Sequence, residues 1–164
     1  MPLAPQELRT FFITAVCANR RRLFQVASNA DLLLSVLNDN HSKGRYQLHA
    51  FVLMPDHIHL LITPAAEISI EKVMQLIKGG FSFQLKSKFD VWQPRFTLHR
   101  IEDARDYQTH VRYIHENPVR AGLCSSAEEF PYSSPYRERK INPAPDQLSW
   151  PTISPNSLNR NRDQ

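Results

Sequence analysis

The spacing of apolar positions along the chain predicts four strands and three helices. Strand-like runs, rich in β-branched and aromatic residues or alternating with polar ones, occupy residues 9–16, 46–54, 57–63 and 91–101. Helix-like runs, with apolar residues three and four positions apart, extend from Ser28 or Asn29 to near Gly44, over 69–88, and over 103–117. The order β-α-β-β-α-β-α indicates an α+β fold: a ferredoxin/RRM-like antiparallel sheet with helices packed on it.

Three details of the pattern carry further expectations. The last helix is expected to stop at Asn117, because Pro118 follows it. The Gly79–Gly80 pair costs about 2 kcal/mol of helix propensity, so it predicts either a break or the close approach of another backbone. One apolar face of the second strand is expected to consist of Tyr46, Leu48, Ala50, Val52 and Met54.

The length and composition fit one domain followed by a tail. A chain of 164 residues can bury a core of its own, and we assign residues 1–136 to one domain. From residue 137 to 164 the sequence is rich in Pro, Ser, Asn and Arg and loses its periodicity, so a mobile tail with at most a short docked segment is expected.

The chain is basic, which is compatible with a nucleic-acid partner. Twenty Lys and Arg residues against sixteen Asp and Glu give a net charge of +4. A solvated helix face explains the lysines equally well. Trp92 or Phe96 is available for base stacking, but for Trp92 a place in the core is favoured. The residues expected to contact phosphates are Arg20, Arg21, Arg22, Lys72, Lys78, Lys86, Lys88 and, beyond the last helix, Arg120.

No sequence signal points to a membrane or to secretion. The first eight residues lack the basic and apolar regions of a signal peptide, and no apolar stretch approaches the roughly 20 residues that span a bilayer. Cys17 and Cys124 show no metal-binding or disulfide spacing. We therefore expect a cytoplasmic protein.

Two histidines share one face of the third predicted strand. With a period of two, His57 and His59 point to the side opposite Ile58, and together they could converge on one divalent cation. An ordinary strand with two surface histidines explains this pair better when it is taken alone. A histidine-triad hydrolase is excluded, because Leu61 stands where the third histidine would be.

Tyr113 lies off the apolar stripe of the last helix. It shares a polar face with Asp106, His110 and Asn117, so the phenol could attack a phosphorus while the Asn117 amide oxygen ligates a metal. A surface tyrosine and a capping asparagine explain the pattern if it stands alone. Two imidazoles and an amide together suit Mg²⁺ or Mn²⁺. His110 is a further candidate base, although a role as a surface polar residue explains it better. The stripe itself consists of Ala104, Tyr107, Val111 and Ile114.

Two segments resemble a known family. The run 54–62, Met-Pro-Asp-His-Ile-His-Leu-Leu-Ile, resembles the HUH motif of single-tyrosine insertion-sequence transposases. The run 113–123, Tyr-Ile-His-Glu-Asn-Pro-Val-Arg-Ala-Gly-Leu, resembles the signature of their REP-associated branch. The segment 96–99, Phe-Thr-Leu-His, departs from the Asp-His pair common in that branch.

The resemblance implies an activity, a site and a substrate. It implies a single-stranded DNA nickase and strand-transferase that forms a 5′-phosphotyrosine at Tyr113, with His57, His59 and Asn117 as metal ligands. The implied substrate is a DNA hairpin with a short adjacent guide sequence, and both a monomer and a homodimer remain open. The alternative is a non-catalytic or domesticated hairpin-binding module for DNA or RNA on the same fold. A rolling-circle initiator or relaxase is usually a larger protein.

Overall fold

The structure is a computed structural model that describes residues 8–137 and 139–150. It contains the predicted strands and helices in the predicted order, with short 3₁₀ turns between β1 and α1 and after α3. Among the described residues, no helix is long and apolar enough to cross a membrane. The bounds are β1 Phe11–Val16, α1 Ala27–Ser42, β2 Tyr46–Leu53, β3 His57–Pro64, α2 Ile70–Leu85, β4 Thr97–Arg100 and α3 Ala104–Arg120.

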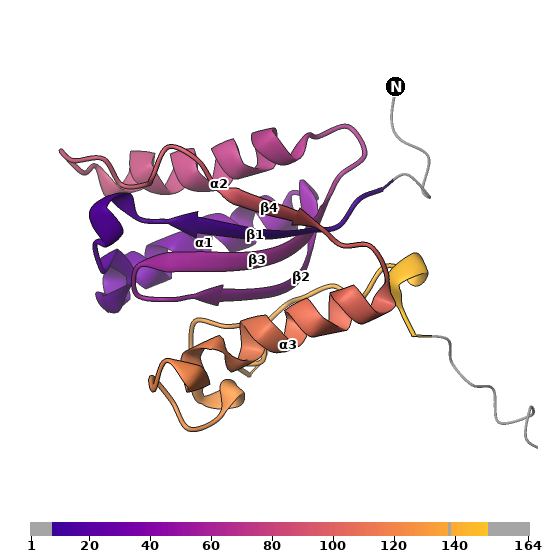
Figure 1. Cartoon of the computed structure of the whole chain (residues 1–164). Helices are drawn as coiled ribbons and strands as arrows, with labels where there is room; N and C mark the ends of the chain where they lie inside the picture. Colours follow the sequence, from indigo (N-terminus) through magenta and orange to yellow (C-terminus); the bar gives the residue numbers. More distant parts are fainter. Residues whose placement is uncertain (1–7, 138, 151–164) are drawn as a thin grey trace, which may run out of the picture.

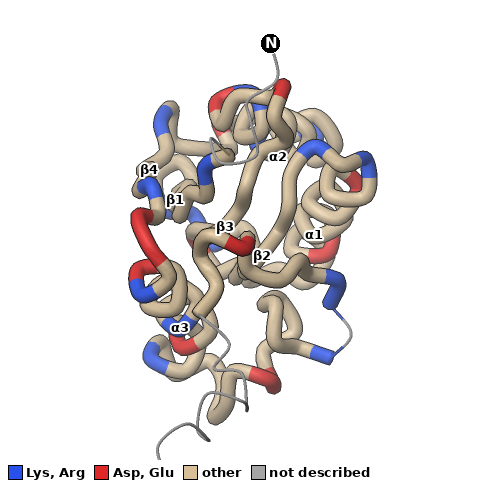
Figure 2. The backbone as a smooth tube through the Cα atoms, turned by 90° about the vertical axis from the view of Figure 1, so that its right-hand side faces the viewer, with Lys and Arg blue, Asp and Glu red and all other residues tan. Residues whose placement is uncertain are grey.

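The strands form one antiparallel sheet in the order β2-β3-β1-β4, with helices on both faces (Figure 1). α1 and α2 cover one face and α3 covers the other, so the molecule has three layers (Figure 2). A large core lies between the sheet and the α1–α2 pair, and a smaller one lies under α3 around Leu61, Tyr107 and Ile114. The α+β fold and the element order predicted from the sequence are confirmed.

The ends of two helices differ from the sequence prediction. α1 begins at Ala27 with no side-chain cap, and Asn29, an expected cap, instead donates from its side chain to the Leu23 carbonyl at 2.9 Å. The expected stop of α3 before Pro118 is wrong, because the helix continues to Arg120. Pro118 lacks the N–H that would donate within the helix, but its ring is buried in the last turn, which offsets part of that loss.

The Gly79–Gly80 pair does not interrupt α2. The helix runs through both residues, and Ser69 caps its start by accepting from the Lys72 N–H at 3.1 Å. A Cβ added at Gly80 would lie 3.2 Å from Cγ1 of Val36 on α1. The glycine therefore permits close packing of the two helices, but the atom that approaches it belongs to a side chain and not to the backbone that was predicted.

The expected single apolar face of β2 is wrong, because the strand contains a β-bulge. Leu48 pairs with Ile62 and Ala50 pairs with Leu61, which leaves His49 as the extra residue. The bulge reverses the alternation, so Leu48 lies in the α1–α2 core while Ala50 lies under α3. Both faces of the strand are buried, because α1 and α2 cover one face of the sheet and α3 covers the other.

The fourth strand is shorter than predicted. β4 covers four residues, and Trp92 instead makes an isolated bridge with Cys17. The indole packs against Phe24 and Phe81 with ring centroids 5.7 and 5.8 Å away, in agreement with the favoured core position.

Part of the expected tail packs against the edge of the sheet. Asn142 donates its N–H to the Leu48 carbonyl at 2.6 Å, and its side-chain oxygen accepts from the Leu48 N–H at 2.9 Å. Leu148 is buried in the core under α3. Residues 138 and 151–164 of the expected tail lie outside the described residues.

Buried His49 joins this segment to the sheet, and it makes folding stability sensitive to acid. Burial lowers the pKa of His49, whose Nε2 lies 2.8 Å from the Thr63 hydroxyl and whose Nδ1 lies 3.0 Å from the Pro143 carbonyl. Because the unfolded chain binds this proton more readily, the free energy of unfolding should decrease as the pH falls below about 6.5, by at most about 1.4 kcal/mol per pH unit for this group. Urea titrations at several pH values measure this, and His49→Gln should flatten the dependence; an unchanged slope in that variant would contradict the assignment.

Candidate active site

The first residues of β3 place two imidazoles beneath α3. The rings of His57 and His59 lie side by side with centroids 4.8 Å apart. Ile58 and Leu60, which alternate with them, are buried in the opposite core. The strand period therefore brings the two imidazoles to one face, as predicted from the sequence.

His59 is buried with one ring nitrogen left without a partner. Its Nδ1 lies 2.8 Å from the Thr14 hydroxyl on the paired strand β1, whereas its buried Nε2 has no hydrogen-bond partner. Burial, with a smaller contribution from His57, lowers the pKa of His59 to about 3, so the ring is neutral near pH 7. A neutral imidazole with one nitrogen held and the other free is the form that binds a metal ion.

His57 is oriented by a carboxylate. Its Nδ1 lies 2.7 Å from Asp56 Oδ1, and Asp56 Oδ2 accepts from Arg20 at 3.3 Å. Burial opposes ionisation of Asp56, but the hydrogen bond from His57 and the charge of Arg20 outweigh it and hold the pKa of the carboxyl below its usual value. This carboxylate–imidazole arrangement leaves His57 Nε2 available as a second ligand.

α3 carries Tyr113 directly against His59 of this pair. The Tyr113 ring is 40% exposed, and its centroid lies 5.4 Å from that of His59 and 5.9 Å from that of Phe12. The guanidinium carbon of Arg120 lies 4.9 Å from the same ring centroid. The solvent-accessible Tyr113 ring therefore contacts both the imidazole of His59 and a permanent positive charge.

Asn117 lies one turn after Tyr113 on the same helix. It is half-buried, and its main-chain carbonyl accepts from the Ala121 N–H at 3.0 Å. Residues four apart on a helix share a face, so its amide is carried on the side of α3 that bears the phenol.

A second cluster, which the sequence analysis did not assemble, lies next to the first. His99 Nε2 on β4 and His110 Nδ1 on α3 lie 2.8 and 3.0 Å from the Asp106 carboxylate, and the three residues form a possible metal-binding group. Phe12 stands between the clusters, with ring centroids 5.2 Å from His59 and 4.7 Å from His110. The i, i+4 spacing of Asp106 and His110 was visible in the sequence, but the pairing of β4 with β1 that brings in His99 was not.

The predicted basic residues fall into separate groups. Arg20–Arg22 lie in the short turns after β1, whose last residue pairs with the first histidine of β3. Lys72 lies in the first turn of α2 and Lys86 caps its far end, so the two are about 21 Å apart along the helix. Lys78 donates to the Gln93 carbonyl at 3.0 Å and packs over the Phe96 ring.

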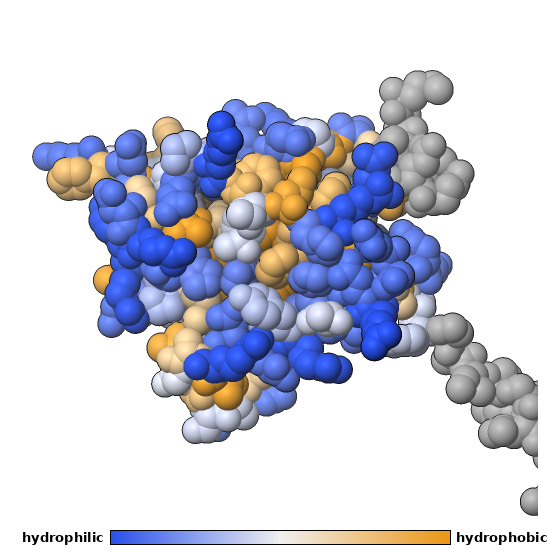
Figure 3. All heavy atoms as spheres, in the orientation of Figure 1, coloured by the Kyte–Doolittle hydropathy of each residue, from blue (hydrophilic) through white to orange (hydrophobic). Residues whose placement is uncertain are grey.

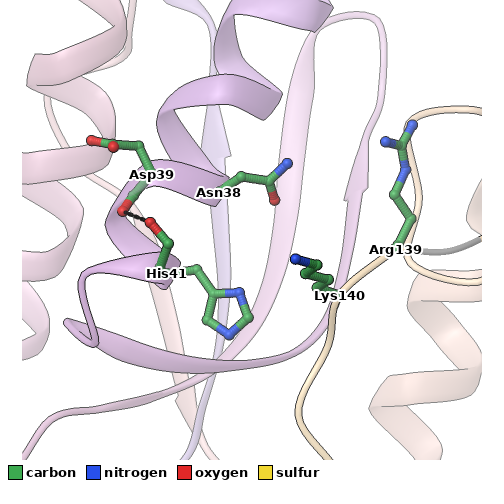
Figure 4. Close-up of a pocket in the computed structure, with 6 residues that line it drawn as sticks. Asn38, Asp39, His41, Arg139 and Lys140 are labelled. Carbon is green, nitrogen blue, oxygen red and sulfur yellow. Dashed lines mark hydrogen bonds between the residues drawn. The ribbon is translucent and has the colours of Figure 1, made fainter.

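A hollow of about 680 Å³ lies away from Tyr113, between the end of α1 and residues 139–140 (Figure 4). Asn38, Asp39 and His41 come from the helix, whereas Arg139 and Lys140 come from the C-terminal segment. Because α1 covers the face of the sheet opposite α3, this hollow takes no part in the site around Tyr113.

The sequence matches the model of one family, described as Transposase IS200 like, over residues 8–117. The chain belongs to the IS200-like transposase family. It is 29% identical over 130 residues to the REP-associated tyrosine transposase of Escherichia coli strain K12, and the match covers 79% of this chain and 78% of that relative. A solved structure of a REP-associated tyrosine transposase bound to a REP hairpin matches this IS200-like transposase with a TM-score of 0.67 and 27% identity, covering 92% of this chain and 88% of that one.

The family match includes the residues brought together beneath α3. Residues 8–117 contain β1, the two histidines of β3, Tyr113 and Asn117. Membership of this family implies nuclease and strand-transferase chemistry for the IS200-like transposase described here.

Proposed function

We propose that this IS200-like transposase is a metal-dependent single-stranded DNA endonuclease and strand-transferase that cuts with Tyr113 as the nucleophile. The observation that carries the proposal is the contact of the accessible Tyr113 ring with buried His59, whose Nε2 has no partner. We include DNA hairpins of palindromic repeats as the substrate because the structural relative is bound to a REP hairpin.

The donor set beneath α3 fits a divalent cation. His57 and His59 each offer an imidazole nitrogen while the other nitrogen of the ring is hydrogen-bonded, and Asn117 offers an amide oxygen one turn from the phenol. We assign these three residues as ligands of Mg²⁺ or Mn²⁺, with Mn²⁺ the better match for imidazole. When bound, the ion supplies charge that polarises the scissile phosphate and stabilises the leaving 3′-oxygen.

In the proposed reaction the Tyr113 oxygen attacks the scissile phosphorus. A bond forms between the phenolic oxygen and phosphorus as the bond from phosphorus to the 3′-oxygen breaks. The phenol gives up one proton and the departing 3′-oxygen gains one, so the products are a 5′-phosphotyrosine and a 3′-hydroxyl. Because one phosphoester replaces another, the 3′-hydroxyl of a second strand can reverse the step and complete strand transfer without an external energy source.

Arg120 has a place in this reaction because its guanidinium lies over the Tyr113 ring. A positive charge at that position attracts the scissile phosphate toward the phenol. Arg120→Ala is expected to lower the single-turnover cutting rate about 3- to 30-fold, measured with excess protein over a labelled hairpin. The matched control is Arg112→Ala, which removes an exposed arginine from the same helix and should change the rate less than twofold. Equal losses in both variants would contradict a specific role.

The test of the proposed function is formation of an SDS-resistant adduct between the protein and a labelled hairpin with unpaired flanks. An adduct is expected in the presence of Mn²⁺ and not in the presence of a chelator. Hairpin binding with neither an adduct nor a nick would instead support the non-catalytic binding module.

A further inference from the structure

A hollow outside the catalytic site lies at the corner where the chain leaves β1. Its volume is about 560 Å³, within the range of about 300–1,000 Å³ for small-molecule sites. It lies between the turn after β1 and the segment that precedes β4. The described residues that line it are Ala18, Asn19, Asp90, Trp92, Gln93 and Pro94.

The walls of this hollow are held together by hydrogen bonds. The Ala18 N–H donates to the Val91 carbonyl at 2.9 Å, and the Gln93 N–H donates to the Val16 carbonyl at 2.8 Å. The Trp92 indole N–H donates to the Lys78 carbonyl at 3.1 Å. These hydrogen bonds hold the segment that precedes β4 to β1 and α2, so the shape of the hollow is fixed by the fold.

The chemistry of the lining favours a nucleobase. Asn19 and Gln93 are exposed carboxamides, Asp90 is an exposed carboxylate, and Trp92 is a half-buried indole. Among the described residues that line the hollow, none is lysine or arginine, so a phosphate group has no cationic partner inside it. Carboxamides and carboxylates hydrogen-bond the edges of bases, and aromatic rings stack on their faces.

An unusually exposed aromatic ring stands beside this hollow. Phe89 directly precedes Asp90 and is 73% exposed, and the guanidinium carbon of Arg21 lies 5.8 Å from its ring centroid. Arg21 also donates to the Asp90 carbonyl, which fixes the arginine at the rim. At the left end of the view in Figure 3, isolated hydrophobic residues lie among hydrophilic ones. An aromatic face with an arginine beside it is a platform on which a base can stack while its phosphate meets the positive charge.

The hollow is connected to the catalytic site by a short chain of contacts. Arg20, next to Asn19 at the rim, donates to Asp56, and Asp56 bonds His57. Val16, at the end of β1, is the residue paired with His57. The corner is therefore close enough to the histidines for an unpaired strand bound beside them to reach it.

We propose that the hollow lined by Asn19, Trp92 and Gln93, with Phe89 at its rim, binds an unpaired base of the single-stranded DNA that flanks the hairpin. This inference rests on the proposed function and adds a specific contact outside the reacting centre. Asp90 favours bases that present an exocyclic amino group, since its carboxylate can only accept.

The experiment compares binding of two fluorescent oligonucleotides by anisotropy: a hairpin with an unpaired flank, and the same hairpin with a blunt end. Phe89→Ala and Gln93→Ala are expected to weaken binding of the flanked hairpin about 5- to 100-fold while changing that of the blunt hairpin less than twofold. Trp150→Ala is the matched control, because it removes another exposed aromatic side chain, 59% exposed, from the C-terminal segment and not from the corner after β1.

An abasic flank then identifies the base as the partner. Abasic positions should weaken binding by the wild-type protein about as much as Phe89→Ala does, and the variant should lose no further affinity for the abasic DNA. Unchanged affinity of both variants for the flanked hairpin would overturn the inference while leaving the proposed nuclease intact. If the wild-type protein bound neither oligonucleotide, the proposed function would fail together with it.

Discussion

Replacing Tyr113 by phenylalanine should reduce DNA cutting at least about 10³-fold, because the variant retains the ring but lacks the attacking oxygen. The contacts of the ring with His59, Phe12 and Arg120 do not require the hydroxyl, so fold and metal site should be preserved. The cutting rate is measured under single-turnover conditions with Mn²⁺ and a labelled hairpin.

The matched control for this prediction is Tyr136→Phe. Tyr136 is another partly exposed tyrosine with arginines beside its ring, but it lies in the C-terminal segment rather than on α3. It should cut at the wild-type rate, and hairpin affinity should stay within twofold in both variants. Cutting by Tyr113→Phe at a rate comparable to the wild type would exclude the phenol as the nucleophile.

His59→Ala is expected to cause the second large loss, of both metal affinity and activity. The variant removes the imidazole whose buried Nε2 has no partner, so Mn²⁺ affinity measured by calorimetry should fall at least about 10- to 100-fold, and cutting should fall with it. The calorimetric measurement needs no DNA, so it separates loss of the ion from loss of substrate binding.

The second histidine cluster supplies the comparison that makes this prediction decisive. His99→Ala removes a histidine from the His99, Asp106 and His110 group without touching the pair on β3. The cutting rate of His99→Ala, and its affinity for the Mn²⁺ ion that cutting requires, should remain within about fivefold of the wild type. If His59→Ala kept its Mn²⁺ affinity and His99→Ala lost it, the metal site would have to be assigned to the second cluster.

The fold could be predicted from the sequence because its periodicities are local. The apolar stripe of α2 and the alternation around His57 depend on neighbouring residues, which the sequence displays directly. The bulge at His49 could not be predicted, since it is set by the pairing of Leu48 and Ala50 with β3. The predicted end of α3 at Asn117 was wrong, because a helix tolerates a proline in its last turn when the buried ring offsets the lost hydrogen bond.

The candidate site could be predicted in part. Spacing within one strand and one helix identified His57, His59, Tyr113 and Asn117, but not which of them touch. The contact of Tyr113 with His59, and the hydrogen bond from β1 that holds His59, are tertiary facts that only the structure supplies. The same limitation hid His99, because its position beside His110 depends on how β4 pairs with β1.

The most direct test of the central claim is to map the covalent linkage itself. The SDS-resistant adduct formed with Mn²⁺ and a flanked hairpin is digested with protease and nuclease, and the modified peptide is sequenced by mass spectrometry. We predict a nucleotide joined through its 5′-phosphate to Tyr113. A linkage to any other residue, or nicked DNA that carries a free 5′-phosphate and no protein, would contradict the proposed mechanism.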